Sequence, residues 1–287
     1  MKNYINKFYL FFALLIAVAG GAFLHFQFPI TATGNAGLTS VLSQVKEVVD
    51  ESLNPPVLPD TETQIPIVMY HYVRVVDKNK DALGYNLSID PENFEKQMQY
   101  LKEQGYTTIH MADLLDKKVP KKAIVLTFDD GLEDFYTTAL PILQKYGFTA
   151  SNGIITGMIG AREHMTEEQI RECVKAGIEL TSHTVNHFDM SKLTRAELKT
   201  QLVESKSYLE KTFGVTVVGL IYPSGRYNEL AVQAARDEGY EIAATTQYGE
   251  AYLDTHNMLL LPRVRIDNRD GYNGFVKKLE AIESVKK

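Results

Sequence analysis

From Ile65 onward, the sequence alternates between short apolar runs and longer segments with the residue spacing of a helix. The apolar runs are IPIVMY, AIVLTF, TASNGII, GIELTS, VVGLIY, EIAATT and MLLLPRVRI. The segments between them are PENFEKQMQYLKEQG, LEDFYTTALPILQKYG, TEEQIRECVKAG, TRAELKTQLVESKSYLEKTFG and NELAVQAARDEG. Such alternation predicts an α/β fold with a mainly parallel sheet, open or closed into a barrel.

The predicted helices carry recognisable start and stop residues. Residue types that favour a helix start stand at Pro91, Thr166, Thr194 and Asn228. Glycines that favour a helix end stand at Gly105, Gly147, Gly177, Gly214 and Gly239. Because both signals flank the same segments, they support the division into separate helices.

Residues 1–28 predict a signal-anchor or transmembrane segment. Lys2 and Lys7 precede the apolar run FYLFFALLIAVAGGAFLHFQF, which has roughly the 20 residues needed to span a bilayer. The lysines favour the cytoplasmic side. The alternative is a cleavable signal peptide, because the residues AVA at 17–19 resemble a cleavage site. We therefore expect a single-pass cell-membrane protein with an extracytoplasmic catalytic domain, or a secreted one if the segment is cleaved.

The remainder of the chain divides into a linker and a catalytic domain. Residues 29–64 are predicted to form a stalk or linker, because they end in the Pro-rich stretch NPPVLPDTETQ. Residues 65–287 are predicted to form the catalytic domain. The net charge of −6 is spread over interspersed acidic and basic residues, which argues against a nucleic-acid partner. Cys173 is the only cysteine, so the chain cannot form an intrachain disulfide.

Two adjacent carboxylates, Asp129 and Asp130, follow the run AIVLTF directly, and Gly131 allows a tight turn after them. In folds of this class, functional side chains gather at the C-terminal ends of the strands. The alternative is helix capping, because LEDFYTTALPIL follows at once. A single aspartate would suffice for a cap, so two at a strand end favour a site.

Two histidines, His183 and His187, follow the run GIELTS. Histidines four residues apart can share one face of a helical turn and bind one metal, although such pairs also occur on solvated faces. Two histidines and one carboxylate form a three-ligand catalytic site of the zinc type, with an open position for water. We therefore expect Asp130, His183 and His187 to bind the metal, which leaves Asp129 free as a base.

These residues resemble two motifs of the polysaccharide deacetylases of the NodB-homology type, known as carbohydrate esterase family 4. The matching stretches are Thr127-Phe128-Asp129-Asp130-Gly131 and His183-Thr184-Val185-Asn186-His187, and the resemblance covers roughly residues 65–270. It implies a deformed (β/α) barrel of about seven mainly parallel strands. It also implies that Asp129 is the general base, that Asp130, His183 and His187 bind a divalent metal, and that Thr184 steadies the turn. Zn²⁺ suits these ligands best, and Co²⁺, Ni²⁺ or Mn²⁺ also fit them.

Two positions depart from the family pattern. The third motif of the family reads Arg-x-Pro-aromatic-Gly, whereas this chain has Ile221 at the arginine position and Ser224 at the aromatic position. The last family motif, Leu-x-His, supplies the general acid, and the matching stretch here ends in Arg263. The substrate-binding residues expected from the third motif are Tyr222, Pro223, Ser224, Gly225 and Tyr227.

His71 is a candidate for the missing acid. The stretch IPIVMYHYV is similar to the segment that opens the catalytic domain in a rearranged branch, which includes bacterial poly-N-acetylglucosamine deacetylases. In that branch an N-terminal strand supplies the acid histidine. The resemblance implies that His71 is the general acid and that Arg263 holds Asp129 or His71 in place. The alternatives are an ordinary histidine at the barrel rim and an arginine that pairs with surface acids.

The expected function is metal-dependent N-deacetylation of an extracellular polysaccharide built from N-acetylglucosamine, with a poly-N-acetylglucosamine exopolysaccharide favoured. The alternatives are a peptidoglycan N-acetylglucosamine deacetylase, an O-acetyl glycan esterase and a catalytically inactive glycan-binding membrane protein. An acetylated glucosamine polysaccharide and the membrane are the expected partners. Aromatic candidates for stacking on sugar rings are Tyr70, Tyr72, Phe188, Tyr222, Tyr227 and Tyr248. The alternative for each of them is that it fills the core.

Overall fold

The structure is a computed structural model that describes residues 64–116, 119–253 and 256–285. The predicted membrane segment, residues 1–28, and the predicted linker up to residue 63 lie outside these residues. Within the described part of the chain, none of the helices combines the length and the apolar character that a bilayer span requires.

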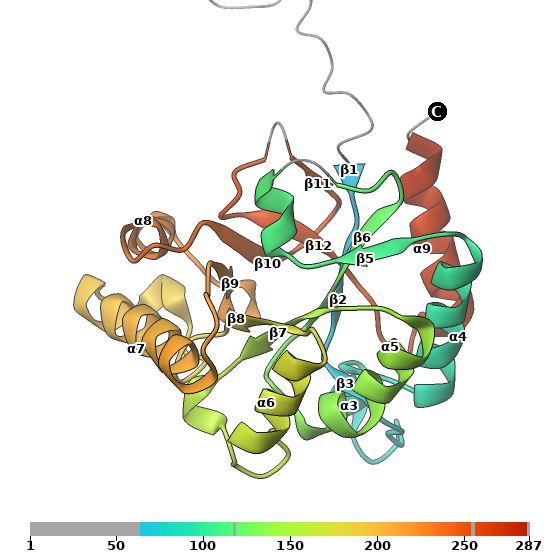
Figure 1. Cartoon of the computed structure of the whole chain (residues 1–287), viewed down its shortest axis with the longest axis horizontal. Helices are drawn as coiled ribbons and strands as arrows, with labels where there is room; N and C mark the ends of the chain where they lie inside the picture. The colour runs from blue at the N-terminus through green and yellow to red at the C-terminus, as the bar shows by residue number, and fades with distance from the viewer. Residues whose placement is uncertain (1–63, 117–118, 254–255, 286–287) are drawn as a thin grey trace, which may run out of the picture. The chain divides into compact units, whose positions relative to one another are not determined.

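Seven parallel strands form a closed barrel (Figure 1). They are β2 (Ile67–Tyr70), β6 (Ala123–Phe128), β7 (Ser151–Ile154), β8 (Glu179–Ser182), β9 (Gly219–Ile221), β10 (Ile242–Tyr248) and β12 (Leu261–Arg265). Their order around the barrel is β2-β12-β10-β9-β8-β7-β6, and pairing of β6 with β2 closes it. The prediction of a barrel of about seven parallel strands is therefore confirmed.

Shorter strands lie beside the barrel strands, and the sequence does not predict them. β5 (Thr107–Ile109) pairs with the first half of β6, and β7 pairs with the end of the same strand. β1 (Gln64–Ile65) pairs with β11 (Ala251–Tyr252), and β3 (Tyr72–Val73) pairs with β4 (Ser88–Ile89). Strands of two or three residues are too short to show a period of two in the sequence.

Helices surround the barrel on its outside (Figure 1). They are α3 (Ala82–Tyr85), α4 (Pro91–Glu103), α5 (Leu140–Tyr146), α6 (Glu167–Lys175), α7 (Arg195–Phe213), α8 (Glu229–Asp237) and α9 (Gly271–Val285). The predicted start signals are confirmed: Thr166 and Thr194 each form a capping box, and the Asn228 side chain accepts from the Ala231 amide. The five predicted closing glycines all have positive φ angles.

Two helical segments differ from the sequence prediction. The single helix predicted from LEDFYTTALPILQKYG divides into a π-helix at Phe135–Ala139 and then α5. Pro141 stands in the first turn of α5, where its missing N–H cannot continue the regular hydrogen-bond pattern of a preceding α-helix. Helix α9 was not predicted, because it begins with the weak helix formers Gly271-Tyr272-Asn273-Gly274.

The core has two layers, because alternate residues of each strand face opposite sides. Strand residues such as Ile67, Val125 and Ile221 form an apolar cluster inside the barrel. A second cluster packs the outer strand faces against the helices. In this outer layer, the ring of Phe94 from α4 lies edge-on to Tyr70 of β2 at 5.3 Å and to Phe128 of β6 at 5.8 Å. These contacts fix the ends of the two strands that lead into the site.

Removal of the Phe94 ring tests this packing. Phe94 has 0% of its surface exposed, so Phe94→Ala is expected to lower the free energy of unfolding by about 3–5 kcal/mol. Phe188, which is 52% exposed, provides the matched control, since the same substitution there is expected to change stability by less than roughly 0.5 kcal/mol. Urea denaturation measures both. Equal losses in the two variants would contradict the assignment of Phe94 to the core.

Candidate active site

Asp130, His183 and His187 converge on one point at the C-terminal end of the barrel. The Oδ1 atom of Asp130 lies 3.4 Å from His183 Nε2 and 3.6 Å from His187 Nε2. One ligand atom from each residue lies within 4.8 Å of the other two. Since a divalent metal binds nitrogen and oxygen ligands at about 2 Å, these three atoms can contact one ion. The three side chains thus fit the divalent metal site that the sequence predicted.

The backbone brings these ligands together through left-handed turns. The φ angles of Asp130, Thr184 and His187 are 77°, 66° and 56°, a region that residues other than glycine rarely adopt and that often marks functional sites. His183 and His187 do not lie on one face of a helical turn, because this segment is an irregular loop. The hydroxyl of Thr184 accepts a hydrogen bond from the His187 amide at 3.1 Å, so Thr184 does steady the turn.

His183 is oriented by a backbone carbonyl. Its Nδ1 atom lies 2.7 Å from the oxygen of Ile221, which directs Nε2 toward Asp130. A metal-binding histidine commonly donates its second ring N–H to such an acceptor. Ile221, which stands where the family pattern has an arginine, therefore contributes to the site through its main chain.

Arg263 crosses the barrel interior to Asp129. Its two terminal nitrogens lie 2.6 and 2.8 Å from the two carboxylate oxygens, a bidentate pair with 0% of Arg263 and 4% of Asp129 exposed. Arg263 also donates to Thr127 Oγ1 at 3.0 Å and, through Nε, to the Thr245 carbonyl at 2.8 Å. Arg263 thus holds Asp129, and the alternative of a surface ion pair is wrong because the guanidinium is completely buried.

This pair controls the charge of Asp129. Burial alone would raise the pKa of the Asp129 carboxyl, but the charge and hydrogen bonds of Arg263 outweigh it and hold the pKa well below its usual range. Asp129 is therefore ionised throughout the neutral range.

His71 lies beside Asp129. Its Nε2 atom is 3.8 Å from Asp129 Oδ2, and 15% of its side chain is exposed. Burial lowers the pKa of His71, and the carboxylates of Asp129 and Asp130 oppose this shift only in part. The structure therefore places His71, which directly follows β2, at the same barrel end as the metal ligands.

The turn after β9 carries the predicted third motif. Pro223–Gly225 form a tight turn in which Ser224 has a φ of 53°. A Cβ atom on Gly225 would overlap Thr246, so this position requires glycine. The ring of Tyr222 is completely buried, with that of Tyr227 packed beside it at 5.0 Å.

Of the two alternatives for the aromatic candidates, core filling holds for Tyr70 and Tyr222, so the expectation that Tyr222 binds substrate is wrong. Both rings are completely buried in the outer core layer, where a sugar cannot reach them. Phe188 and Tyr248 are exposed, whereas Tyr72 and Tyr227 are half-buried.

Some residues of the site were missed in the sequence. Thr245 and Ile221 act through main-chain oxygens, and such a role leaves no trace in the residue type. Asp134, whose carboxylate accepts a hydrogen bond from the Val73 amide at 3.2 Å, resembles any acidic residue at the start of an amphipathic helix.

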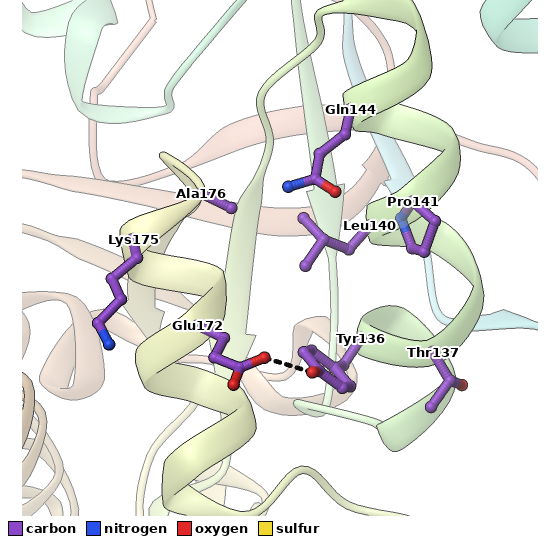
Figure 2. A pocket seen from close by; sticks show the side chains of 8 residues that line it. All are labelled: Tyr136, Thr137, Leu140, Pro141, Gln144, Glu172, Lys175 and Ala176. Carbon is purple, nitrogen blue, oxygen red and sulfur yellow. Dashed lines mark hydrogen bonds between the residues drawn. The ribbon is translucent and has the colours of Figure 1, made fainter.

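A groove of about 610 Å³ lies apart from this cluster, on the outside of the barrel (Figure 2). It is lined by Tyr136, Thr137, Leu140, Pro141, Gln144, Glu172, Lys175 and Ala176. The Tyr136 hydroxyl donates to Glu172 across one side of the groove (Figure 2). No residue of the metal, Asp129 or His71 cluster lines it, so the groove plays no part in the chemistry described above.

Arg263→Met tests the buried ion pair. The substitution leaves the Asp129 carboxylate without its partner, and we expect the free energy of unfolding near neutral pH to fall by about 3–5 kcal/mol. Because the pKa of Asp129 is depressed in the folded protein, the stabilisation by the pair is present above the unfolded-state pKa of about 4 and is lost as the pH falls further. The difference between wild type and variant, measured by urea denaturation, should therefore shrink in acid.

Arg265 supplies the matched control for this experiment. It lies on the same strand but is partly exposed, and its partner Asp267 also pairs with Arg269 at 2.5 Å. Arg265→Met is expected to cost less than about 1 kcal/mol. A loss as large as that of Arg263→Met would contradict a special role for the Asp129 pair.

The sequence is similar to known polysaccharide deacetylases. The family model described as polysaccharide deacetylase matches residues 116–243. The Bacillus subtilis protein named "Putative polysaccharide deacetylase YxkH" is 34% identical over 225 residues, which cover 77% of this chain and 77% of that protein. A poly-beta-1,6-N-acetyl-D-glucosamine N-deacetylase of Staphylococcus epidermidis is 25% identical over 243 residues, covering 76% of this chain and 83% of the relative.

The fold is similar to solved structures of other proteins. The Streptococcus pyogenes deacetylase PplD in complex with acetate matches with a TM-score of 0.70 and 34% identity, over 75% of this chain and 97% of that one. IcaB from Ammonifex degensii matches with a TM-score of 0.65 over 75% and 96% of the two chains, and at 19% identity this likeness concerns the fold alone. With its closed barrel and its convergent Asp130, His183 and His187, the chain belongs to the polysaccharide deacetylase family of metal-dependent hydrolases.

Proposed function

We propose that this protein removes N-acetyl groups from N-acetylglucosamine units of an extracellular polysaccharide, with a poly-N-acetylglucosamine-type polymer as the favoured substrate. The observation that carries the proposal is the placement of His71 and Asp129 beside the Asp130, His183 and His187 cluster, with 3.8 Å between His71 Nε2 and Asp129 Oδ2. Similarity to a staphylococcal poly-beta-1,6-N-acetyl-D-glucosamine N-deacetylase over 76% of the chain supports the choice of polymer.

Three side chains would hold the metal, and two others would move protons. A divalent metal held by Asp130, His183 and His187, for which Zn²⁺ is our first choice, would supply the Lewis acidity that activates water and polarises an acetamide carbonyl. Asp129, kept ionised by Arg263, accepts a proton from the attacking water. The positive charge of Arg263 lowers the basicity of the Asp129 carboxylate. The short bidentate contact also fixes the orientation of this carboxylate, and a fixed orientation favours the proton transfer.

His71 completes the proton transfers. The new carbon–oxygen bond forms as the water proton passes to Asp129, and the carbon–nitrogen bond then breaks. An amine leaves poorly unless its nitrogen is protonated, so His71 as an imidazolium donates that proton. Because burial lowers the pKa of His71, its charged form gives up the proton readily. The products are acetate and the free amine of glucosamine.

Acetate release from a panel of substrates tests the function. We expect release from β-1,6-linked N-acetylglucosamine oligomers to exceed release from β-1,4-linked oligomers, peptidoglycan and O-acetylated glycans. A chelator should abolish it and added Zn²⁺ should restore it. If peptidoglycan or an O-acetylated glycan proves to be the best substrate, it replaces the proposed polymer. If no acetate is released from any substrate in the presence of metal, the proposed deacetylase activity is contradicted.

Metal content identifies the ligands in the same preparations. Asp130→Ala and His187→Ala should reduce metal affinity by more than about 10-fold, since even supporting residues of metal sites contribute 10–100-fold. Asp237→Ala on the exposed face of α8 is the matched control and should bind metal as the wild type does. Full metal occupancy in both ligand variants would contradict the assignment.

His71→Ala tests the proton donor. We expect the rate of N-deacetylation to fall by about 10²–10⁴-fold, because the leaving amine loses its acid catalyst. Hydrolysis of 4-nitrophenyl acetate should fall far less, since 4-nitrophenolate leaves without protonation. His110→Ala, a partly exposed histidine that hydrogen-bonds to Thr149 outside this cluster, serves as the control. Equal losses on the amide and the ester would contradict the role of His71.

A further inference from the structure

The ring of His71 makes few polar contacts. Among the described residues, it makes no side-chain hydrogen bond, and its nearest charged partner is Asp129 Oδ2 at 3.8 Å. A catalytic acid must nevertheless be held close to one geometry, because a displacement of about 1 Å can cost 10²-fold in rate. The position of His71 therefore depends on the backbone that carries it.

Hydrogen bonds on both sides of His71 fix this backbone. On the N-terminal side, the Asp129 amide donates to the Tyr70 carbonyl at 3.0 Å. On the C-terminal side, the Tyr72 amide donates to the Leu87 carbonyl at 3.1 Å, and the Val73 amide donates to Asp134 Oδ2 at 3.2 Å. Asp129 and Asp134 both belong to residues 129–134, the segment that also carries the base and one metal ligand. The acid and the base are thus tied to one another through a short stretch of chain.

The Asp134 carboxylate contacts the Val73 amide and the Arg74 guanidinium. Asp134 precedes the π-helix Phe135–Ala139, but its side chain makes no capping hydrogen bond. Its Oδ1 atom is buried and lacks a hydrogen-bond partner among the described residues. Burial raises the pKa of Asp134 to about 6, with Arg74 and Glu163 as the charged groups that face it. Burying a carboxyl group with an unpaired oxygen costs free energy of folding. This cost indicates that Asp134 has a function that offsets it.

We propose that Asp134 is a positioning residue that sets His71 against Asp129 by accepting the Val73 amide. This inference rests on the proposed role of His71 as the acid. It assigns Asp134 no contact with the substrate or the metal.

Arg74 supports the same arrangement from outside. Its Nε atom lies 3.9 Å from Asp134 Oδ2, and its Nη1 atom lies 3.3 Å from Glu163 Oε2. The guanidinium also stacks over the ring of Tyr72 at 3.7 Å. Because Arg74 and Glu163 are partly exposed, their ion pair is weak in water. The hydrogen bond from Val73, rather than this ion pair, is therefore the interaction to test.

Three variants separate the hydrogen bond from the charge. Asp134→Ala removes the acceptor, and we expect kcat for N-deacetylation to fall by about 10–100-fold with KM and metal content unchanged. Asp134→Asn keeps an acceptor oxygen without the charge and should restore kcat to within about threefold of wild type. Glu163→Gln, the control, removes a charge that faces Arg74 while leaving the Val73 contact intact, and should leave kcat unchanged.

A double variant shows whether Asp134 acts through His71. In the His71→Ala background the acid is already absent, so Asp134→Ala should reduce kcat no further. An additional loss equal to that of the single variant would overturn the inference, as would full kcat in Asp134→Ala on a substrate that the wild type deacetylates. Failure of the wild type on every substrate would instead count against the proposed function.

A crystal structure of Asp134→Ala tests the geometry without any substrate. We expect the separation of His71 Nε2 and Asp129 Oδ2 to increase beyond the 3.8 Å of the wild type. An unchanged separation would overturn the inference even if the activity had fallen. If Asp134→Ala does not fold, Asp134→Leu takes its place, because leucine fills the same buried space without an acceptor. Its crystal structure and its kcat then test the inference in the same way.

Discussion

The ion pair between Arg263 and Asp129 is the interaction on which the rest of the site depends. Removing two charges from water costs several kcal/mol per ion, and the cost is recovered only when the pair is close and its other hydrogen-bonding atoms are satisfied. Here the contact is bidentate at 2.6 and 2.8 Å, and Thr127 and Thr245 take further donors of the guanidinium. Through these contacts, Arg263 links β12, β10 and the end of β6 inside the barrel. The guanidinium that joins these strands is also the charge that keeps Asp129, the proposed base, ionised.

The origin of this arginine explains the departures from the family pattern. The side chain of Ile221, at the usual arginine position, packs inside the barrel so closely that a Cβ on Gly153 would lie 2.9 Å from it. Asp129 already pairs with an arginine, because Arg263 contacts both of its oxygens. Arg263 in turn occupies the place of the usual acid histidine, and β2 brings His71 to the same barrel end. The changes at Ile221, Arg263 and His71 are therefore consistent with one another.

Much of the fold could be predicted from the sequence because its signals are local. The strand Ala123–Phe128 and the caps at Thr166 and Thr194 arise from neighbouring residues, and the metal ligands follow strands as expected. Features that depend on distant contacts could not be predicted in this way. The burial of Tyr222 depends on which side of β9 faces the helices, and the role of Asp134 depends on its meeting with Val73. The left-handed backbone at Thr184 could not be predicted either, because the residue itself gives no sign of it.

That left-handed backbone shows how the site obtains its precision. Asp130, Thr184, His187 and Ser224 all have positive φ angles, and they follow the three strands β6, β8 and β9. Each such residue costs about 1–2 kcal/mol, which is a considerable share of a total stability of roughly 5–15 kcal/mol. The closed barrel with its two apolar layers supplies the rigidity that keeps these turns in place. These turns place one ligand atom from each of Asp130, His183 and His187 within 4.8 Å of the other two.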